Sequence, residues 1–170
     1  ALGGKVIATA GSQDKLDVCK HYGADVLMNY RSDDWQKQVM QVTGGKGVDV
    51  VFDPVGLVQK SLKVIAWKGR IVVVGFAAGS IEKIPMNLAL LKNISLVGLH
   101  WGAYFKKEPK RVPVVWKELL ELYQKGDLKP VLYSRIFSFE ALATGLAAIE
   151  DRSSYGKVIL KIKEDTKARL

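Results

Sequence analysis

Residues 5–30 read KVIATAGSQDKLDVCKHYGADVLMNY, and their pattern alternates between strand and helix. A short aliphatic run at 6–8 predicts a strand, and a turn of small residues follows it at 10–12. A helix is predicted from there to Gly23, which ends it, and a second strand begins at Val26. This stretch therefore predicts two parallel strands joined by a crossover helix.

The end of the first strand carries the residues that would select a dinucleotide cofactor. NAD-selective sheets place Asp or Glu there, to accept a hydrogen bond from the ribose 2′-hydroxyl. This strand ends without a carboxylate and is followed by Ser12 and Lys15. A hydroxyl, an ammonium and the N–H groups that open a helix would favour a 2′-phosphate, and the pattern indicates NADPH. The alternative is that Ser12 and Asp14 cap a helix and Lys15 is a surface lysine.

The composition is that of a globular protein of 170 residues, long enough for one well-packed domain. No apolar run approaches the roughly 20 residues of a membrane span. The net charge of +9 raises the question of nucleic acid, but basic residues are spread along the chain beside acidic ones, as at 106–108. We therefore expect neither a nucleic-acid partner nor a membrane span. The single cysteine, Cys19, excludes an internal disulfide framework and agrees with an intracellular compartment, cytoplasmic or mitochondrial.

Strand and helix patterns continue to alternate as far as residue 125. Aliphatic runs predict further strands at 48–52, 71–74 and 95–99. A helix between the first two is predicted to carry Val58, Leu62 and Ile65 on its inner face and to end at Gly69. A loop is predicted to start at His100, and a long amphipathic helix covers 112–125.

This alternation predicts an α/β fold, a doubly wound parallel sheet of the Rossmann-like type. Ligands of such sheets bind at the carboxyl ends of the strands. Turn chemistry explains the glycines and the Asp-Pro pair found at these ends. It does not explain why Tyr30, Phe76 and Trp101 all fall at the same edge of the predicted sheet, which indicates a binding site there.

Several segments resemble the zinc-independent quinone oxidoreductase branch of the medium-chain dehydrogenase/reductases. They are AGSQDKLDVCKHYGAD, NYRSDDW, GVDVVFDPVG, GRIVVVGFAAGSIEKIPMNLALLKNISLVGLHWG and YGKVILKI, in this order along the whole chain. The resemblance implies an NADPH-dependent enzyme, commonly a dimer, that reduces quinones or other activated double bonds. In that branch the hydride passes directly from the nicotinamide, so we expect no catalytic acid or base among these residues. One Cys and two His without ligand spacing predict no metal site.

The resemblance also implies which residues would contact the cofactor. The 2′-phosphate and the adenosine would meet Ser12, Lys15 and Tyr30. The ribose would lie beside Val55 and Gly56. The nicotinamide end would meet the remaining candidates, which are Gly75, Phe76, Ala77, Leu99, His100 and Trp101.

The glycine-rich phosphate loop of the family is missing from the sequence. Gly3 and Gly4 precede a strand and so cannot replace a loop that joins a strand to a helix. We therefore expect 1–127 to be an N-terminally truncated nucleotide-binding domain, without its first strand and phosphate loop, and inactive alone. Residues 128–170 would be a C-terminal segment that returns toward the catalytic domain.

A second hypothesis of another class remains open from the sequence. The strand at 95–99 would lie at the edge of the sheet, and an apolar edge strand can pair with another chain. The chain would then be a non-catalytic interaction module. In the family that it resembles, the equivalent strand joins two subunits into a homodimer.

Overall fold

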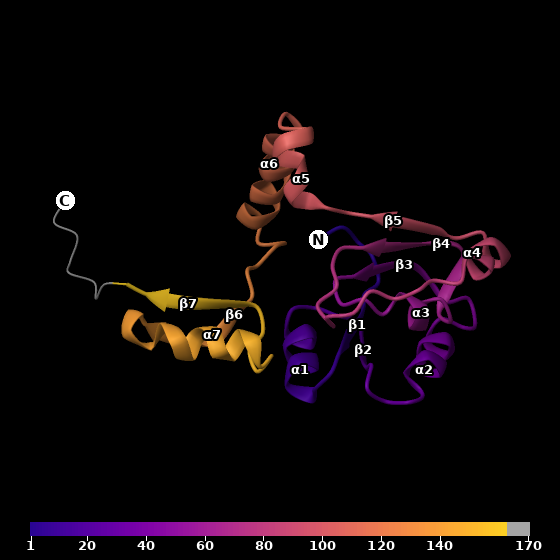
Figure 1. Ribbon diagram of the computed structural model, residues 1–170, viewed down its shortest axis with the longest axis horizontal. Coiled ribbons are helices and arrows are strands. Elements are labelled where there is room, and N and C mark those ends of the chain that lie inside the picture. The colour runs from indigo at the N-terminus through magenta and orange to yellow at the C-terminus, as the bar shows by residue number, and fades with distance from the viewer. Residues whose placement is uncertain (163–170) are drawn as a thin grey trace. The chain divides into compact units, whose positions relative to one another are not determined.

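The computed structural model describes residues 1–162 (Figure 1). Contacts divide the chain into two compact units, one formed by Leu2–Lys117 and the other by Ala1 together with the residues from Glu118 onward. The predicted change from nucleotide-binding domain to C-terminal segment at 127–128 stays a prediction. No helix in the described part of the chain is both long and apolar enough to cross a bilayer.

The first unit begins with a parallel strand pair. Its elements are β1 (Ile7–Ala10), α1 (Gln13–His21) and β2 (Val26–Asn29). The register runs from Ile7 opposite Val26 to Ala10 opposite Asn29. Gly23 adopts a φ of 92°, a conformation that glycine tolerates, and this lets the chain turn from α1 into β2.

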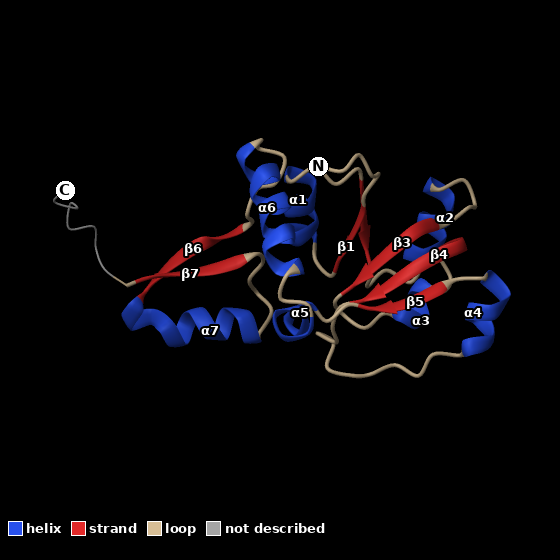
Figure 2. Ribbon diagram, turned by 90° about the horizontal axis from the view of Figure 1, so that it is seen from above, coloured by secondary structure: helices blue, strands red, loops and turns tan. Residues whose placement is uncertain are grey.

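A second, three-stranded parallel sheet follows in the same unit, with the order β3-β4-β5. Its strands are β3 (Val48–Asp53), β4 (Ile65–Val73) and β5 (Ser95–Gly98). The helices that precede them are α2 (Trp35–Val42), α3 (Val58–Ser61) and α4 (Met86–Lys92). The predicted α/β class with parallel strands is confirmed. Figure 2 shows β3, β4 and β5 as neighbouring arrows with β1 set apart from them, because β1 and β3 are not hydrogen-bonded to each other.

Two packed clusters hold these layers together. One joins α2 to β2 through Met28, Trp35, Val39 and Val64. The other joins α3 to β4 through Val58, Leu62, Ile65 and Ile71. Burial of such aliphatic side chains is the main stabilising contribution that the sequence offers, at about 1.5–3 kcal/mol for each.

The helix predicted from Val58 to Gly69 is wrong in its second half. Helix α3 ends at Ser61, and Ile65 already belongs to β4, where it pairs with Val48. Val50 then pairs with Arg70, so the intervening residues of β4 leave the ladder. Lys68 has a φ of 60°, which an α-helix does not allow. The buried residues Val58 and Ile65 have the spacing of one helix face, but Val58 lies in helix α3 and Ile65 lies in strand β4.

The loop predicted after His100 is also shorter than expected. Helix α5 (Trp101–Lys107) starts at once, and α6 (Arg111–Gln124) follows it. The ring of Trp101 lies 5.2 Å from that of Tyr104 and 6.2 Å from that of Phe105, measured between centroids. Residues three and four apart face each other only on a helix, and this aromatic spacing was the missed signal.

The second unit contains a small parallel strand pair with a helix between its strands. Its elements are β6 (Leu132–Ser138), a 3₁₀ turn (Phe139–Ala141), α7 (Leu142–Glu150) and β7 (Lys157–Lys161). Phe137 is buried, and its ring lies 3.4 Å from where a Cβ on Gly145 would stand, so the glycine lets α7 approach β6.

Candidate functional site

The carboxyl ends of β1 and β2 form the first part of the site, which we call the β1–β2 rim (residues 10–15 and 29–31). The two strand ends are joined by a hydrogen bond of 3.1 Å from the Tyr30 N–H to the Ala10 carbonyl. A Cβ on Gly11 would stand 2.8 Å from the Tyr30 hydroxyl and 3.1 Å from Nε of Arg31. Both side chains therefore lie directly against Gly11, and a larger residue there would require them to shift.

Ser12 occupies the N-cap position of α1 with an extended backbone (φ −149°, ψ 156°). Its carbonyl accepts the Leu16 N–H at 3.2 Å, but its side chain makes no capping hydrogen bond to the helix. The interpretation of Ser12 as a simple capping residue therefore has no side-chain hydrogen bond behind it. Lys15 follows in the first turn of α1 and is half-buried.

Arg31 is the residue of this rim that sequence reasoning missed. Its backbone N–H donates to the Asn29 side-chain oxygen at 3.0 Å, which holds the turn after β2 in place. The nearby carboxylate of Asp34 is directed to other donors, Ser32 and Gln38, and these hydrogen bonds lower its pKa, with the larger effect from Ser32. The signal in the sequence was position alone, because Arg31 follows Tyr30 at the end of β2.

The loops after β3 and β4 form the second part of the site, which we call the β3–β4 rim (residues 53–57 and 74–80). Backbone hydrogen bonds run between the loops from Ala77 to the Pro54 carbonyl at 3.1 Å and from Ala78 to the Val55 carbonyl at 2.8 Å. A Cβ on Gly75 would stand only 3.2 Å from the Pro54 carbonyl oxygen. This rim brings together five of the predicted residues, which are Val55, Gly56, Gly75, Phe76 and Ala77.

Gly56 is constrained by its backbone. Its φ is 95°, in the region that favours glycine, and a Cβ there would lie 3.6 Å from the ring of Phe76. Phe76 itself remains 46% exposed. An aromatic face is thus presented beside a loop that cannot accept a larger residue without strain.

Leu99, His100 and Trp101 follow β5, the next strand of the same sheet. The Leu99 N–H donates to the Val73 carbonyl at 2.9 Å, which places these residues next to the end of β4. His100 is exposed, and the Trp101 ring packs on its own helix. The structure therefore brings this group to the correct edge of the sheet and shows its aromatic ring in contact with Tyr104 and Phe105.

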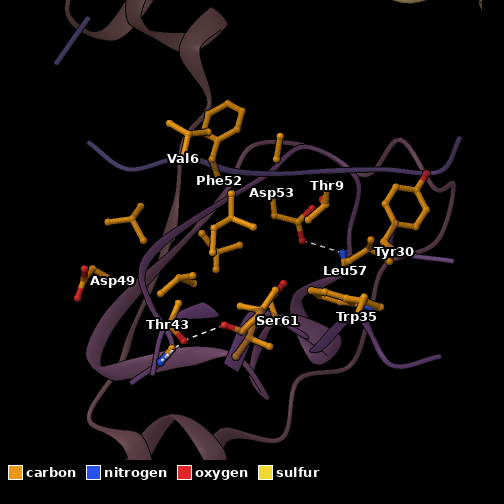
Figure 3. A pocket seen from close by; sticks show the side chains of 18 of the residues that line it. Val6, Thr9, Tyr30, Trp35, Thr43, Asp49, Phe52, Asp53, Leu57 and Ser61 are labelled. Atoms are coloured by element: carbon orange, nitrogen blue, oxygen red, sulfur yellow. Dashed lines mark hydrogen bonds between the residues drawn. The ribbon is translucent and has the colours of Figure 1, made fainter. Parts of the chain in front are cut away.

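A cavity of about 860 Å³ lies between β1 and β3, and we call it the slot. Its walls are the sides of these two strands, and Figure 3 shows their side chains around it. Only Tyr30 and Val55 among the predicted residues line it. The slot thus separates the β1–β2 rim from the β3–β4 rim.

The backbone groups that face the slot follow from the strand pairing. Val6 and Ala10 accept hydrogen bonds from the β2 side of the pair, so Ile7 and Thr9 direct their N–H and C=O groups to the opposite edge. The Asp53 carbonyl accepts the Val74 N–H at the end of β4. The preceding residue, Phe52, therefore directs its backbone N–H and C=O groups to the opposite edge of β3, which faces the slot. Neither edge has a strand partner within residues 1–162.

Within the described residues there is no group of three or more His, Cys, Asp or Glu side chains that could bind a metal ion. The predicted absence of a catalytic acid or base stays a prediction. The chemistry that the rims offer is binding: hydroxyl and cationic groups at one rim, and an aromatic ring with tightly placed loop backbone at the other.

Comparison with known proteins finds a matching family model and similar proteins. The family model for zinc-binding dehydrogenases matches residues 1–124. Quinone oxidoreductase-like protein 2 of Bos taurus is 38% identical over 95% of this chain and 47% of its own length.

Solved structures agree with this match. A crystal structure of an NAD-dependent alcohol dehydrogenase superposes with a TM-score of 0.77 at 34% identity, over 95% of this chain and 45% of that one. A quinone oxidoreductase of Pseudomonas syringae pv. Tomato DC3000 gives a TM-score of 0.81 at 26% identity, over 95% and 50%. The chain therefore spans about half the length of these relatives.

Proposed function

The chain belongs to the zinc-binding dehydrogenase family, and from this we propose that it is the nucleotide-binding part of an NADPH-dependent oxidoreductase that transfers hydride to a quinone or another activated double bond. The observation that carries the proposal is the arrangement of two rims at the carboxyl ends of parallel strands, where ligands of such sheets bind. Relatives named quinone oxidoreductase support the electron acceptor.

The choice of NADPH rests on the β1–β2 rim. No carboxylate stands at the end of β1, whereas Ser12 and the side chain of Arg31 lie beside Gly11. A 2′-phosphate would meet a hydroxyl and cationic groups there, and charge-assisted hydrogen bonds of this kind are among the strongest. One relative is named as NAD-dependent, so the rim residues and not the family decide this point.

The residues present fit such a cofactor at both ends. The close approach of Tyr30 to Gly11 gives the adenosine an aromatic neighbour, while Phe76 is exposed beside Gly56 for the nicotinamide end. When bound, the cofactor would supply the hydride. The protein's share is to hold the two ends in place and to orient the ring.

The part of the cofactor between its adenosine and nicotinamide ends would need a further element of the protein to bind it. We propose that an extended strand fills the slot, parallel to β1 and β3, and that a phosphate-binding turn follows it. Support comes from the backbone groups that both strands direct into the slot, since open strand edges of this kind can pair with a further strand. Val50 and Phe52 of β3 also line the slot and are 59% and 65% exposed, so apolar surface there is left for a further part of the protein to cover.

The test is a titration of the intact protein with NADPH and with NADH, followed by anaerobic mixing of the reduced complex with a simple benzoquinone. We expect tighter binding of NADPH and oxidation of its nicotinamide, seen as loss of absorbance, only when quinone is added. Equal affinity for both cofactors would remove the NADPH assignment. Binding without oxidation by quinones or enones would remove the proposed reaction.

We further propose a homodimer through the edge of β5. This strand pairs only with β4 in the described part of the chain, and its Val97 is 38% exposed. Open strand edges of this kind pair with a second chain. The oxidoreductase names of the relatives favour an enzyme over a non-catalytic interaction module. The unpaired Cys19 agrees with an intracellular setting, cytoplasmic or mitochondrial.

A further inference from the structure

We propose that Asp53 is a positioning residue, which locks the β3–β4 rim in the shape that receives the nicotinamide end of the cofactor. This inference rests on the proposed function and names a residue that the cofactor would not touch. It starts from a buried carboxylate that the sequence pattern presented only as part of a turn.

Asp53 is 4% exposed and stands on the last position of β3. Its Oδ1 accepts the N–H groups of Val55 at 2.8 Å and Gly56 at 2.9 Å, and its Oδ2 accepts that of Leu57 at 2.7 Å. Figure 3 shows the last of these bonds. Three donors compensate the burial of a charge that would otherwise be costly.

The same residue is connected to the second loop of the rim. Its carbonyl accepts the Val74 N–H at 2.9 Å, where β4 ends and the loop begins. The next two residues of its own loop, Pro54 and Val55, accept from the residues around 77–78. Asp53 therefore fixes one loop directly, and that loop is hydrogen-bonded to the other.

This arrangement decides which groups a ligand can meet. The N–H groups of Val55, Gly56 and Leu57 all point at the carboxylate, so they are not directed at a bound cofactor. A ligand at this rim would instead contact the outer surface of the loop, including the exposed ring of Phe76. The affinity of that end must then depend on shape, and shape depends on Asp53.

Asp53→Asn keeps the size of the side chain and changes its bonding. An amide oxygen can still accept from two N–H groups, but the amide nitrogen would face the Leu57 N–H, donor against donor. We expect the loop to shift and NADPH affinity in the intact protein to fall about tenfold, the loss of one charge-assisted hydrogen bond.

The measurement compares NADPH with adenosine 2′,5′-bisphosphate, which has the adenosine end of the cofactor and no nicotinamide. Asp53→Asn should weaken the binding of NADPH and leave the affinity for the bisphosphate within twofold of that of the wild type. The control is Asp127→Asn, which removes an exposed carboxylate in the other unit and should change neither affinity. Equal weakening of both ligands by Asp53→Asn would show a general structural role and overturn the proposal, as would no change in either.

A second variant keeps the test decisive if Asp53→Asn does not fold. Ala78→Pro removes the N–H that donates to the Val55 carbonyl, so it unlinks the two loops while Asp53 stays in place. The same selective loss of NADPH affinity is expected, and unchanged affinity would overturn the proposal. A wild-type protein that binds the bisphosphate but not NADPH, or neither ligand, would instead count against the proposed function.

Discussion

Lys15 is the residue through which the choice of cofactor can be tested most directly. It lies in the first turn of α1, one turn after the end of β1. Lys15→Ala should weaken NADPH binding in the intact protein and leave NADH binding nearly unchanged, because only NADPH carries the 2′-phosphate. A charge-assisted contact contributes about 1.5–3 kcal/mol. Calorimetric titration with both cofactors gives the comparison.

The matched control for Lys15 is Lys20→Ala, an exposed lysine in the last turn of the same helix. It removes the same charge at a distance from the rim. Because salt screens exposed charges over such distances, we expect little change in the affinity for either cofactor. Equal losses for NADPH and NADH in Lys15→Ala would make Lys15 an ordinary surface lysine.

Arg31 allows a second, independent test of the choice of cofactor at the same rim. Its Nε lies beside Gly11, so the guanidinium is within reach of a phosphate held at Ser12. Arg31→Met keeps much of the apolar stem and removes the charge and its donors. We expect a loss of NADPH affinity of roughly tenfold or more, which shrinks as ionic strength rises. A loss that is the same at all salt concentrations would argue for packing, and NADH again serves as the internal control.

Single residues also show why part of the site could be predicted and part could not. Ser12 and Tyr30 were predicted because their place at strand ends follows from the strand pattern alone. Arg31 and Asp53 were missed, because their significance comes from what they contact: a glycine in the turn after a neighbouring strand in one case, and three backbone N–H groups in the other. The contact of Arg31 is formed by the fold and leaves no spacing in the sequence. The bonds of Asp53 are local, to residues two to four positions further on, but a turn motif does not show that the carboxylate is buried.

The strand β5 can be tested as an element. Leu99 donates its N–H to β4, so its alternate neighbour Val97 also faces β4, and Gly98 directs its N–H to the open edge. A Cβ on Gly98 would meet nothing within 4 Å. Gly98→Pro should therefore remove an edge donor without disturbing the core, and the intact protein should become monomeric.

Light scattering and sedimentation measure that change, with Gly98→Ala as the control. The alanine variant keeps the N–H group and should remain dimeric. A stable dimer in Gly98→Pro would place the subunit contact elsewhere on the molecule. Val97→Pro would not separate these cases, because its missing N–H belongs to the ladder with β4.

Elements differed in how well their sequence patterns predicted them. The strands β1, β3 and β5 were found because uninterrupted aliphatic runs flanked by turn residues have few other meanings. The region 62–69 was misread, because Leu62 and Ile65 have the spacing of a helix face while β3 already provides a partner for Ile65. Strand pairing over a long sequence separation outweighed the local pattern there.

At the scale of the whole first unit, the sheet is divided in two. The sequence predicted a doubly wound parallel sheet without its first strand and phosphate loop. The structure has β1-β2 and β3-β4-β5 as separate sheets with the slot between them. The predicted strand ends are at the expected edge, but the element that would connect the two rims is not among the described residues.

This division leads to a prediction for the 170-residue chain by itself. A pyrophosphate is normally bound by backbone N–H groups at the start of a helix, shaped by glycines that allow close approach. At the β3–β4 rim the N–H groups of 55–57 are taken by Asp53. At the β1–β2 rim the N–H groups that open α1 lie where the 2′-phosphate is proposed to bind, so they are not placed for the pyrophosphate. The two ends of the cofactor would then be held without its middle. Losing two or three charge-assisted hydrogen bonds, at about 1.5–3 kcal/mol each, lowers affinity by several orders of magnitude.

We therefore expect residues 1–170 alone to bind NADPH no more tightly than about millimolar and to show no turnover with quinones. Amide hydrogen exchange should also find the N–H groups of Ile7 and Phe52, which face the slot, exchanging faster than that of Asp53, which faces β4. Calorimetry is the deciding measurement. Micromolar NADPH affinity for this chain would mean that the pyrophosphate is bound without a strand in the slot, and the proposal that a strand and its phosphate-binding turn complete the site would fall with it.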